Sequence, residues 1–147
     1  MSTTRKETVR RAVEALGRGD VDGFLADATD DFVFTLAGSP PGGSRLEGKA
    51  ELVTLLKTLF GSRLEGGAIP TQQDLLLADG DVVVEQARGR ANTVEGEAYD
   101  NVYCRIWRFR GEQLASLTEF MDTELARRCL WSGPIEDPIP RAEGEGR

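Results

Sequence analysis

The sequence predicts an α+β fold, a cone-shaped α+β barrel in which three N-terminal helices pack in a strongly curved, mostly antiparallel sheet. Apolar residues recur at helical spacing mainly in the first 60 residues. Four strand-like segments then follow one another, and helices segregated from consecutive strands are typical of α+β proteins. The 147 residues suit one domain, because a chain of this length buries roughly 68–70% of its unfolded surface and can enclose a cavity.

Three helices are expected before residue 61. The first covers residues 4–16, where Thr4 and Glu7 fit a capping box ahead of an apolar stripe. Asp20 is a favoured capping residue and predicts the start of a second, short helix. The third helix covers residues 48–60 and has leucines on its buried side.

Strands and turns account for most of the remaining chain. Strands are expected over residues 32–36, 68–78, 81–91, 99–109 and 113–122, and a short helix over 123–130. Asp79-Gly80 and Gly111 predict the tight turns between them. Alternation places two sets of residues on one face of their strands: Phe32, Phe34 and Leu36, and later Val82, Val84, Gln86 and Arg88.

The strand over residues 99–109 has two unlike faces. One face is aromatic but is interrupted by an amide and a guanidinium; it carries Tyr99, Asn101, Tyr103, Arg105, Trp107 and Phe109. A mostly apolar, aromatic surface with a few placed polar groups is typical of a pocket wall. The sequence therefore predicts a small-molecule pocket against this face.

Charge and composition exclude several kinds of site. The net charge of −7 argues against nucleic acid and anionic membrane as partners, since both need a basic surface. No histidine is present, which excludes imidazole metal ligands and histidine-based triads. Acid–base chemistry then falls to carboxylates, Tyr, Lys, Cys or water. We expect neither a metal nor a cofactor.

The termini and the cysteines bear on compartment and domain limits. The two cysteines, Cys104 and Cys129, show no metal or disulfide spacing and are interpreted as free thiols in a reducing cytoplasm. The N-terminus lacks the apolar segment of a signal peptide, so a cytoplasmic protein is expected. Residues 131–147 are rich in Pro, Gly and charge and predict a flexible C-terminal tail after a domain over residues 1–130.

Four local segments carry a family resemblance. They are Arg18-Gly-Asp-Val-Asp-Gly-Phe24, Leu46-Glu-Gly-Lys-Ala50, Asn101-Val-Tyr103 and Glu119-Phe-Met-Asp-Thr123. Together with the element order over residues 4–130, they resemble the SnoaL-like branch of the nuclear-transport-factor-2-like superfamily. That superfamily includes ketosteroid isomerases, scytalone dehydratase and limonene epoxide hydrolase. The resemblance implies the cone fold but leaves the reaction open, because this fold hosts many chemistries.

The resemblance implies site residues only in part. Asp122 falls where SnoaL-like cyclases and limonene epoxide hydrolase carry a pocket aspartate that acts as a base. The hydrolase adds an Arg and an Asp on an earlier strand, and these positions correspond here to Gln86 and Arg88, without a second carboxylate. Its Tyr and Asn on the first strand fall in residues 32–36, where Thr35 is the one polar candidate. Neither that hydrolase site nor a ketosteroid isomerase base is complete in this sequence.

Two interpretations stay open for each polar candidate. Asp122 is a general base or acid at the pocket floor, or else the N-cap of the following helix. Arg105 recognises a carboxylate, enolate or phenolate of the ligand, or else it forms an internal salt bridge to Asp122 or Glu119 or extends to the pocket mouth. Asn101 and Tyr103 orient a ligand carbonyl group, or else they bond each other or the backbone.

Further candidates line the pocket or lie outside it. The expected substrate-binding residues are Arg105, Arg88, Trp107, Phe34 and Phe120, of which the aromatic ones form wall or core. Glu119 is expected to point away from Asp122, toward solvent or an interface. The second face of the strand over 99–109 is apolar as well, with Val102, Cys104 and Ile106, and predicts a homodimer formed sheet to sheet.

These residues predict a cofactor-independent enzyme with acid–base chemistry of isomerase, cyclase or hydrolase type on an apolar carbonyl or polyketide-like compound. Asp122 is the expected proton-transfer group, and Tyr103 and Asn101 are the other catalytic candidates. The expected ligand is small and apolar or weakly anionic. The alternative is a non-catalytic ligand-binding or dimerisation module of the same fold.

Overall fold

The computed structural model describes residues 4–38 and 44–130. Its helices are α1 (Arg5–Gly17), α2 (Val21–Phe24), α3 (Lys49–Arg63), a single 3-10 turn η1 (Glu65–Gly67) and α4 (Thr123–Leu130). Its strands are β1 (Ala28–Leu36), β2 (Ser44–Glu47), β3 (Thr71–Asp79), β4 (Val82–Gly89), β5 (Ala91–Asn92), β6 (Ala98–Tyr99), β7 (Val102–Arg110) and β8 (Gln113–Met121). The predicted flexible tail, residues 131–147, lies outside the described residues.

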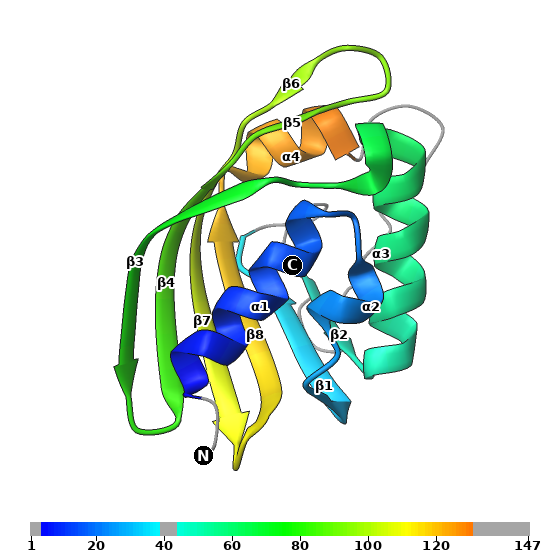
Figure 1. Ribbon diagram of the computed structural model, residues 1–147. Helices are drawn as coiled ribbons and strands as arrows, with labels where there is room; N and C mark the ends of the chain where they lie inside the picture. The colour runs from blue at the N-terminus through cyan, green and yellow to red at the C-terminus, as the bar shows by residue number, and fades with distance from the viewer. Residues whose placement is uncertain (1–3, 39–43, 131–147) are drawn as a thin grey trace.

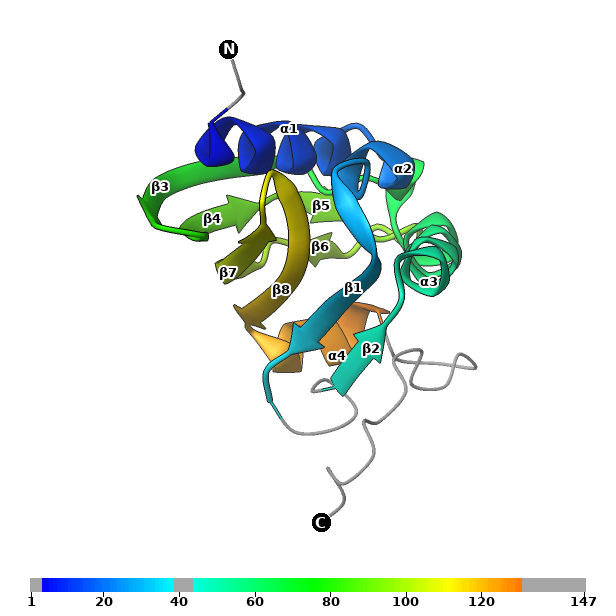
Figure 2. The same ribbon diagram turned by 90° about the horizontal axis from the view of Figure 1, so that it is seen from below.

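Six strands form one strongly curved sheet whose concave side holds α1 (Figures 1 and 2). The strand order is β2-β1-β8-β7-β4-β3, and every neighbouring pair is antiparallel except β1 with β8. The edge strands β2 and β3 do not pair with each other, so the sheet is open. The predicted cone-shaped α+β fold is confirmed, although the sheet does not close into a barrel.

The first helices begin at the predicted capping residues. Thr4 Oγ1 accepts a hydrogen bond from the Glu7 amide at 3.2 Å, and Asp20 Oδ1 accepts one from the Gly23 amide at 2.8 Å. Each bond satisfies an amide that a helix start would otherwise leave unpaired. The short edge strand β2 is not predicted from the sequence, and α3 ends at Arg63 rather than at the predicted residue 60.

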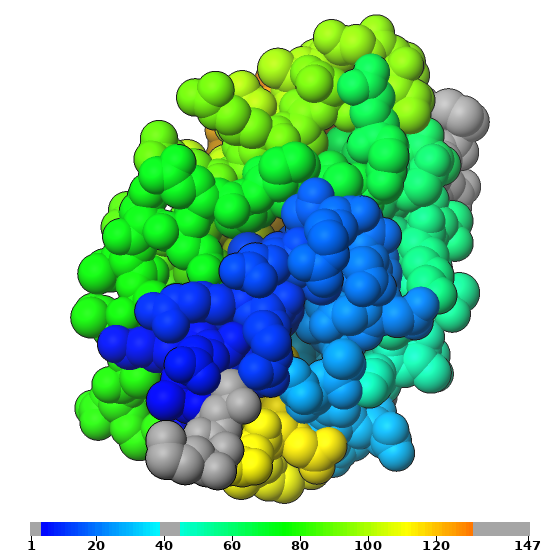
Figure 3. All heavy atoms as spheres, in the orientation of Figure 1, coloured from blue at the N-terminus to red at the C-terminus, as the bar shows by residue number. Residues whose placement is uncertain are grey.

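The core lies between the concave side of the sheet and helices α1–α3. Its members include Val9 and Val13 of α1, Leu52 of α3 and Phe32 of β1, all at most 2% exposed. The space-filling view shows α1 and α2 covering the open side of the cone between β3 and α3 (Figure 3). This cover encloses the inward face of β7, on which the predicted pocket residues lie.

The opposite, convex side of the sheet exposes apolar side chains. Val102 of β7 is 56% exposed and Phe120 of β8 is 46% exposed, and the neighbouring Cys104 is exposed as well. Leu75 and Leu77 on β3 add two further exposed apolar side chains. Contiguous exposed apolar surface is typical of an interaction surface. No helix within residues 4–38 and 44–130 is long and apolar enough to cross a membrane.

The convex face generates the first prediction, a homodimer. We expect light scattering to give twice the 16.0 kDa mass of the chain. Phe120→Glu places a charge in the apolar surface and should shift the protein to the monomer mass, whereas Ala26→Glu, a matched change at an exposed position off the sheet, should not. A strictly monomeric wild-type protein would show that this prediction is wrong.

Candidate functional site

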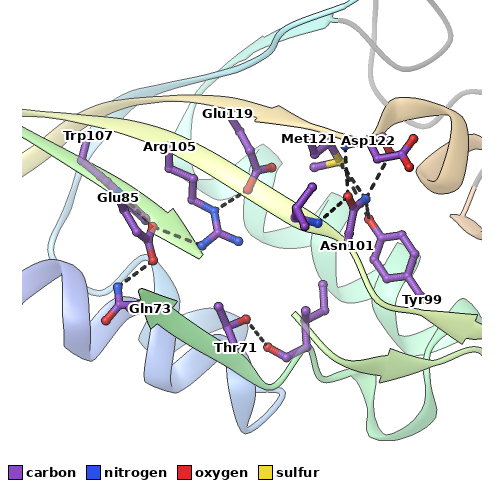
Figure 4. Close-up of polar contacts among 12 residues, drawn as sticks. Thr71, Gln73, Glu85, Tyr99, Asn101, Arg105, Trp107, Glu119, Met121 and Asp122 are labelled. Carbon is purple, nitrogen blue, oxygen red and sulfur yellow. Dashed lines mark hydrogen bonds and ion pairs between the residues drawn. The ribbon is translucent and has the colours of Figure 1, made fainter. Parts of the chain in front are cut away.

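Three buried charged side chains form one row across the concave side of the sheet. Arg105 of β7 lies directly opposite Glu85 of β4 and Glu119 of β8 in the strand register. Its Nη1 donates to Glu85 Oε1 at 3.2 Å and its Nε donates to Glu119 Oε2 at 2.5 Å (Figure 4). Residues directly opposite on neighbouring strands have Cβ atoms about 5 Å apart. The register therefore brings the three charges together.

Glu85 is the fully enclosed member of this row. Its Oε2 accepts a hydrogen bond from Gln73 Nε2 at 2.6 Å, and its Oε1 accepts one from Trp107 Nε1 at 3.0 Å in addition to the Arg105 bond. The side chain is 0% exposed. Glu85 thus has no oxygen left for a ligand, and its effect on the site is to hold the Arg105 guanidinium in place.

Glu119 and Arg105 keep unused hydrogen-bonding groups. Within the described residues, Glu119 Oε1 has no hydrogen-bond partner, and neither does the second terminal nitrogen of Arg105, Nη2. Burial by itself lowers the pKa of Arg105, but Glu119 and Glu85 outweigh that effect, so the pKa is raised above its ordinary value. Arg105 is a permanent cation between two carboxyl groups.

A small cavity adjoins one end of the row. Its volume is about 60 Å³ and its lining is mostly aliphatic and aromatic, including Phe34, Leu56, Phe60 and Leu117. The polar side chains that line it are Tyr99, Tyr103, Arg105 and Glu119. A water molecule needs about 10–15 Å³ of such space, so the cavity accommodates about four to six non-hydrogen atoms.

Tyr103 contributes an unpaired hydroxyl to this cavity wall. Its ring stacks on the Arg105 guanidinium, with the Arg105 Cζ atom 4.2 Å from the ring centre. The hydroxyl is buried and interacts with the neighbouring Tyr99 hydroxyl, but it makes no hydrogen bond of normal geometry within the described chain. The Tyr99 hydroxyl is itself bonded to Asn101 and Met121. Burial raises the pKa of Tyr103 well above its ordinary value and the pKa of Tyr99 to about 12. Both phenols are neutral donors at physiological pH.

Asn101 and Asp122 are occupied with the backbone rather than with the cavity. Asn101 Oδ1 accepts from the Val102 and Asp122 amides at 2.7 and 3.0 Å, and its Nδ2 donates to the Asp122 carbonyl and the Tyr99 hydroxyl, both at 3.1 Å (Figure 4). The Asp122 side chain is exposed, and its Oδ1 accepts from the Leu125 amide at 3.1 Å as the N-cap of α4. Of the two interpretations of Asp122, the structure shows the N-cap, and Asp122 does not line the cavity beside Arg105. Its strand ends at Met121, and α4 begins at Thr123.

The structure separates the five substrate-binding candidates. Phe34 and Arg105 line the cavity as expected. Trp107 is 0% exposed and packs edge to face on Phe24 in the core. Arg88 and Phe120 do not line this cavity, because both point to the convex side, where they border a separate groove together with Asp122. There Arg88 forms an exposed, two-point salt bridge with Asp74 at 2.8 and 3.0 Å.

Two glutamates that were not among the predicted site residues, Glu85 and Glu119, pair with Arg105 in the site. The inward positions of β4 are Val83, Glu85, Ala87 and Gly89, so Gln86 and Arg88 face outward and the inward carboxylate of this strand is Glu85. The three consecutive valines at 82–84 are apolar on both faces, and they gave no alternation from which to fix the phase of the strand. Glu119 is only 8% exposed rather than solvent-facing, because it is on the same face of β8 as Leu117 and Met121.

The strongest signal available in the sequence was Arg105 itself. A buried guanidinium requires an acidic partner on a neighbouring strand, and the internal salt bridge to Glu119 was one of the two interpretations. In the described residues, no group of three or more Cys, Asp or Glu side chains is placed to hold a metal ion.

The comparisons with known proteins agree with this fold. The sequence model of the SnoaL-like domain family matches residues 9–117. No curated protein matches the sequence.

Solved structures share the fold at low sequence identity. An NTF2-like protein of unknown function from Burkholderia pseudomallei has a TM-score of 0.74 and 22% identity, over 88% of this chain and 100% of that one. An LEH-like epoxide hydrolase of M. tuberculosis has a TM-score of 0.69 and 19% identity, over 86% and 88%. The pinacolase BvnE of Penicillium brevicompactum has a TM-score of 0.72 and 20% identity, over 84% and 89%.

The tyrosines generate a prediction on alkaline titration. Tyr99 and Tyr103 are the two tyrosines of the chain, so tyrosinate absorbance reports only on the site. A raised pKa in the folded state favours the neutral phenol, and for Tyr99 this contribution to stability is present below pH 10.0 and is lost as the pH rises through about 12. At a pH just above 10.0 the native protein should show little tyrosinate and the urea-unfolded protein should show much. Equal ionisation in both states would contradict the burial of these hydroxyls.

The N-cap of α4 generates a prediction on stability. Asp122→Ala removes the acceptor of the Leu125 amide and should lower the free energy of unfolding by about 1 kcal/mol. Asp122→Asn keeps an acceptor oxygen and should change it by only a few tenths of that amount. Urea denaturation measures both values, and an Asn variant as unstable as the Ala variant would argue against the capping role.

Proposed function

The chain belongs to the SnoaL-like domain family, and we propose that it is a cofactor-independent enzyme that moves a proton on a small, mostly apolar carbonyl compound. One observation carries the proposal. In the cavity wall the Glu119 carboxylate lies near two donors that make no hydrogen bond of normal geometry in the described structure, Arg105 Nη2 and the Tyr103 hydroxyl. A base beside a pair of unused donors matches the needs of enolisation.

The residues have distinct roles in this reaction. A ligand carbonyl oxygen accepts hydrogen bonds from Arg105 Nη2 and Tyr103. Glu119 Oε1 takes a proton from the carbon next to the carbonyl group, and the electron pair of that C–H bond moves toward the oxygen to form the enolate. The two donors stabilise the negative charge on the oxygen. Return of the proton to another carbon gives isomerisation, and attack of the enolate carbon on a second carbonyl group gives cyclisation.

Glu85, Gln73 and Trp107 act behind this set. None of the three lines the cavity. Gln73 and Trp107 donate hydrogen bonds to Glu85, and Glu85 in turn holds Arg105 in position. Glu119 replaces Asp122 as the proton-transfer residue, because Asp122 is exposed and bonded to the start of α4. The related solved structures named as an epoxide hydrolase and a pinacolase support acid–base chemistry of this general kind on this fold.

The cavity volume limits the size of the substrate. A space of about 60 Å³ is well below the roughly 300–1,000 Å³ of sites for drug-sized ligands. Of the two expected substrate classes, a small carbonyl compound fits better than a polyketide-like one, which requires the wall to move.

Solvent hydrogen exchange tests the proposal without knowledge of the product. In D2O, the protein should speed the exchange of the C–H protons next to the carbonyl group of butanone or a ketone of similar size, followed by NMR. Glu119→Gln should slow this exchange by about 100-fold or more, as loss of a general base does. Tyr103→Phe should slow it as well.

Asp122→Asn is the matched control, since it makes the same chemical change at the other candidate carboxylate. It should leave the exchange rate unchanged. Equal rates for Glu119→Gln and wild type, or loss of activity in Asp122→Asn alone, would overturn the assignment. Ketone binding with no exchange above the buffer rate would favour the alternative, a non-catalytic binding module of the same fold.

A further inference from the structure

The interior of the protein carries more negative than positive charge. Of the described residues, three charged side chains are buried: Glu85, Arg105 and Glu119. Their side chains are 0%, 1% and 10% exposed. Two carboxylates therefore share one guanidinium, and an uncompensated buried charge is strongly unfavourable. A positively charged ligand bound beside these side chains would balance their net negative charge.

The negative charge without a protein partner lies on Glu119, which lines the cavity. Both oxygens of Glu85 are bonded to protein donors, so Glu85 and Arg105 neutralise each other. Glu119 uses Oε2 for Arg105, and its Oε1 has no partner among the described residues. Since Glu119 lines the cavity, the free carboxylate oxygen is available to a ligand there.

A second, independent feature points to a hydrogen-bonding ligand at the same place. Tyr103 lines the cavity and is only 4% exposed, and its buried hydroxyl has no hydrogen-bond partner of normal geometry in the described chain. A phenol oxygen accepts hydrogen bonds as well as donating them. Tyr99, Phe34 and Phe60 also line the cavity, and aromatic rings attract organic cations over their faces.

We propose that the cavity recognises a protonated amine, with the ammonium group donating to Glu119 Oε1 and the Tyr103 oxygen and the apolar body of the ligand against the aromatic wall. The inference rests on the cavity of the proposed function and names a competing ligand for it: the ammonium group occupies the Glu119 oxygen that acts as the base there, so the amine blocks the proposed reaction and is not its substrate. A carboxylate ligand would bring a second uncompensated negative charge next to Glu119. The charge balance thus disfavours the weakly anionic ligand expected from the sequence.

Three probes of nearly equal size and different charge test the inference: butylammonium, butanol and butyrate. Each has five or six non-hydrogen atoms, close to the capacity of the cavity. Binding is followed by amide chemical-shift changes of wild-type protein at neutral pH. Butylammonium should bind about tenfold more tightly than butanol, the scale expected for a hydrogen bond to a charged group, and butyrate should bind least.

Two variants separate the site from the overall charge of the protein, which attracts any amine. Glu119→Gln should abolish the preference for butylammonium over butanol. Glu14→Gln removes the same charge from an exposed position of α1 and should leave the preference intact. Shift changes should map to the strands around Tyr103 and Glu119.

Several outcomes would overturn amine recognition. They are equal binding of butylammonium and butanol by the wild type, tighter binding of butyrate, or an unchanged preference in a folded Glu119→Gln protein. Equal binding by the wild type would show that the buried row does not select a positively charged ligand. Amine binding without any ketone exchange would refute the proposed reaction alone, and ketone exchange without an amine preference would refute this inference alone.

Discussion

The row of Glu85, Arg105 and Glu119 is the constraint on which the site depends. Three charged groups lie in a region that excludes water, and removing one member of such a group typically costs about 3–5 kcal/mol because its partners stay buried. The row is also tied to strand register, since a shift by one residue would turn every side chain of β7 to the other face of the sheet. The same contacts that orient Arg105 therefore specify how the three central strands align.

Asn101 links the start of β7 to the end of β8 through hydrogen bonds rather than through ion pairs. Its amide side chain makes hydrogen bonds to both the amide and the carbonyl group of Asp122, which joins the start of β7 to the end of β8. Asp122 then begins α4, and Leu130 of α4 reaches the cavity wall. Two residues predicted to be catalytic thus have a supporting function: they position the helix that forms part of the wall.

Much of the fold followed from the sequence because its signals were local. Capping residues marked the starts of α1 and α2, and alternation along residues 99–109 correctly assigned all six inward side chains of that segment. The site was harder, since it depends on phase between strands. The valine run at 82–84 concealed which face carried Glu85. Asp122 rather than Glu119 was predicted as the proton-transfer residue, because position along the chain does not reveal where a strand ends and a helix cap begins.

The cavity side and the convex side of the sheet share the same strand backbones, which links the two surfaces. Glu119 faces the cavity while its neighbour Phe120 faces the convex side, and the same holds for Arg105 and Cys104 on the adjacent strand. A molecule that packs on the convex face presses on the same backbone that carries the ion pair on the other side. We expect association at that face and ligand binding in the cavity to be energetically coupled, each altering the affinity of the other by the same factor.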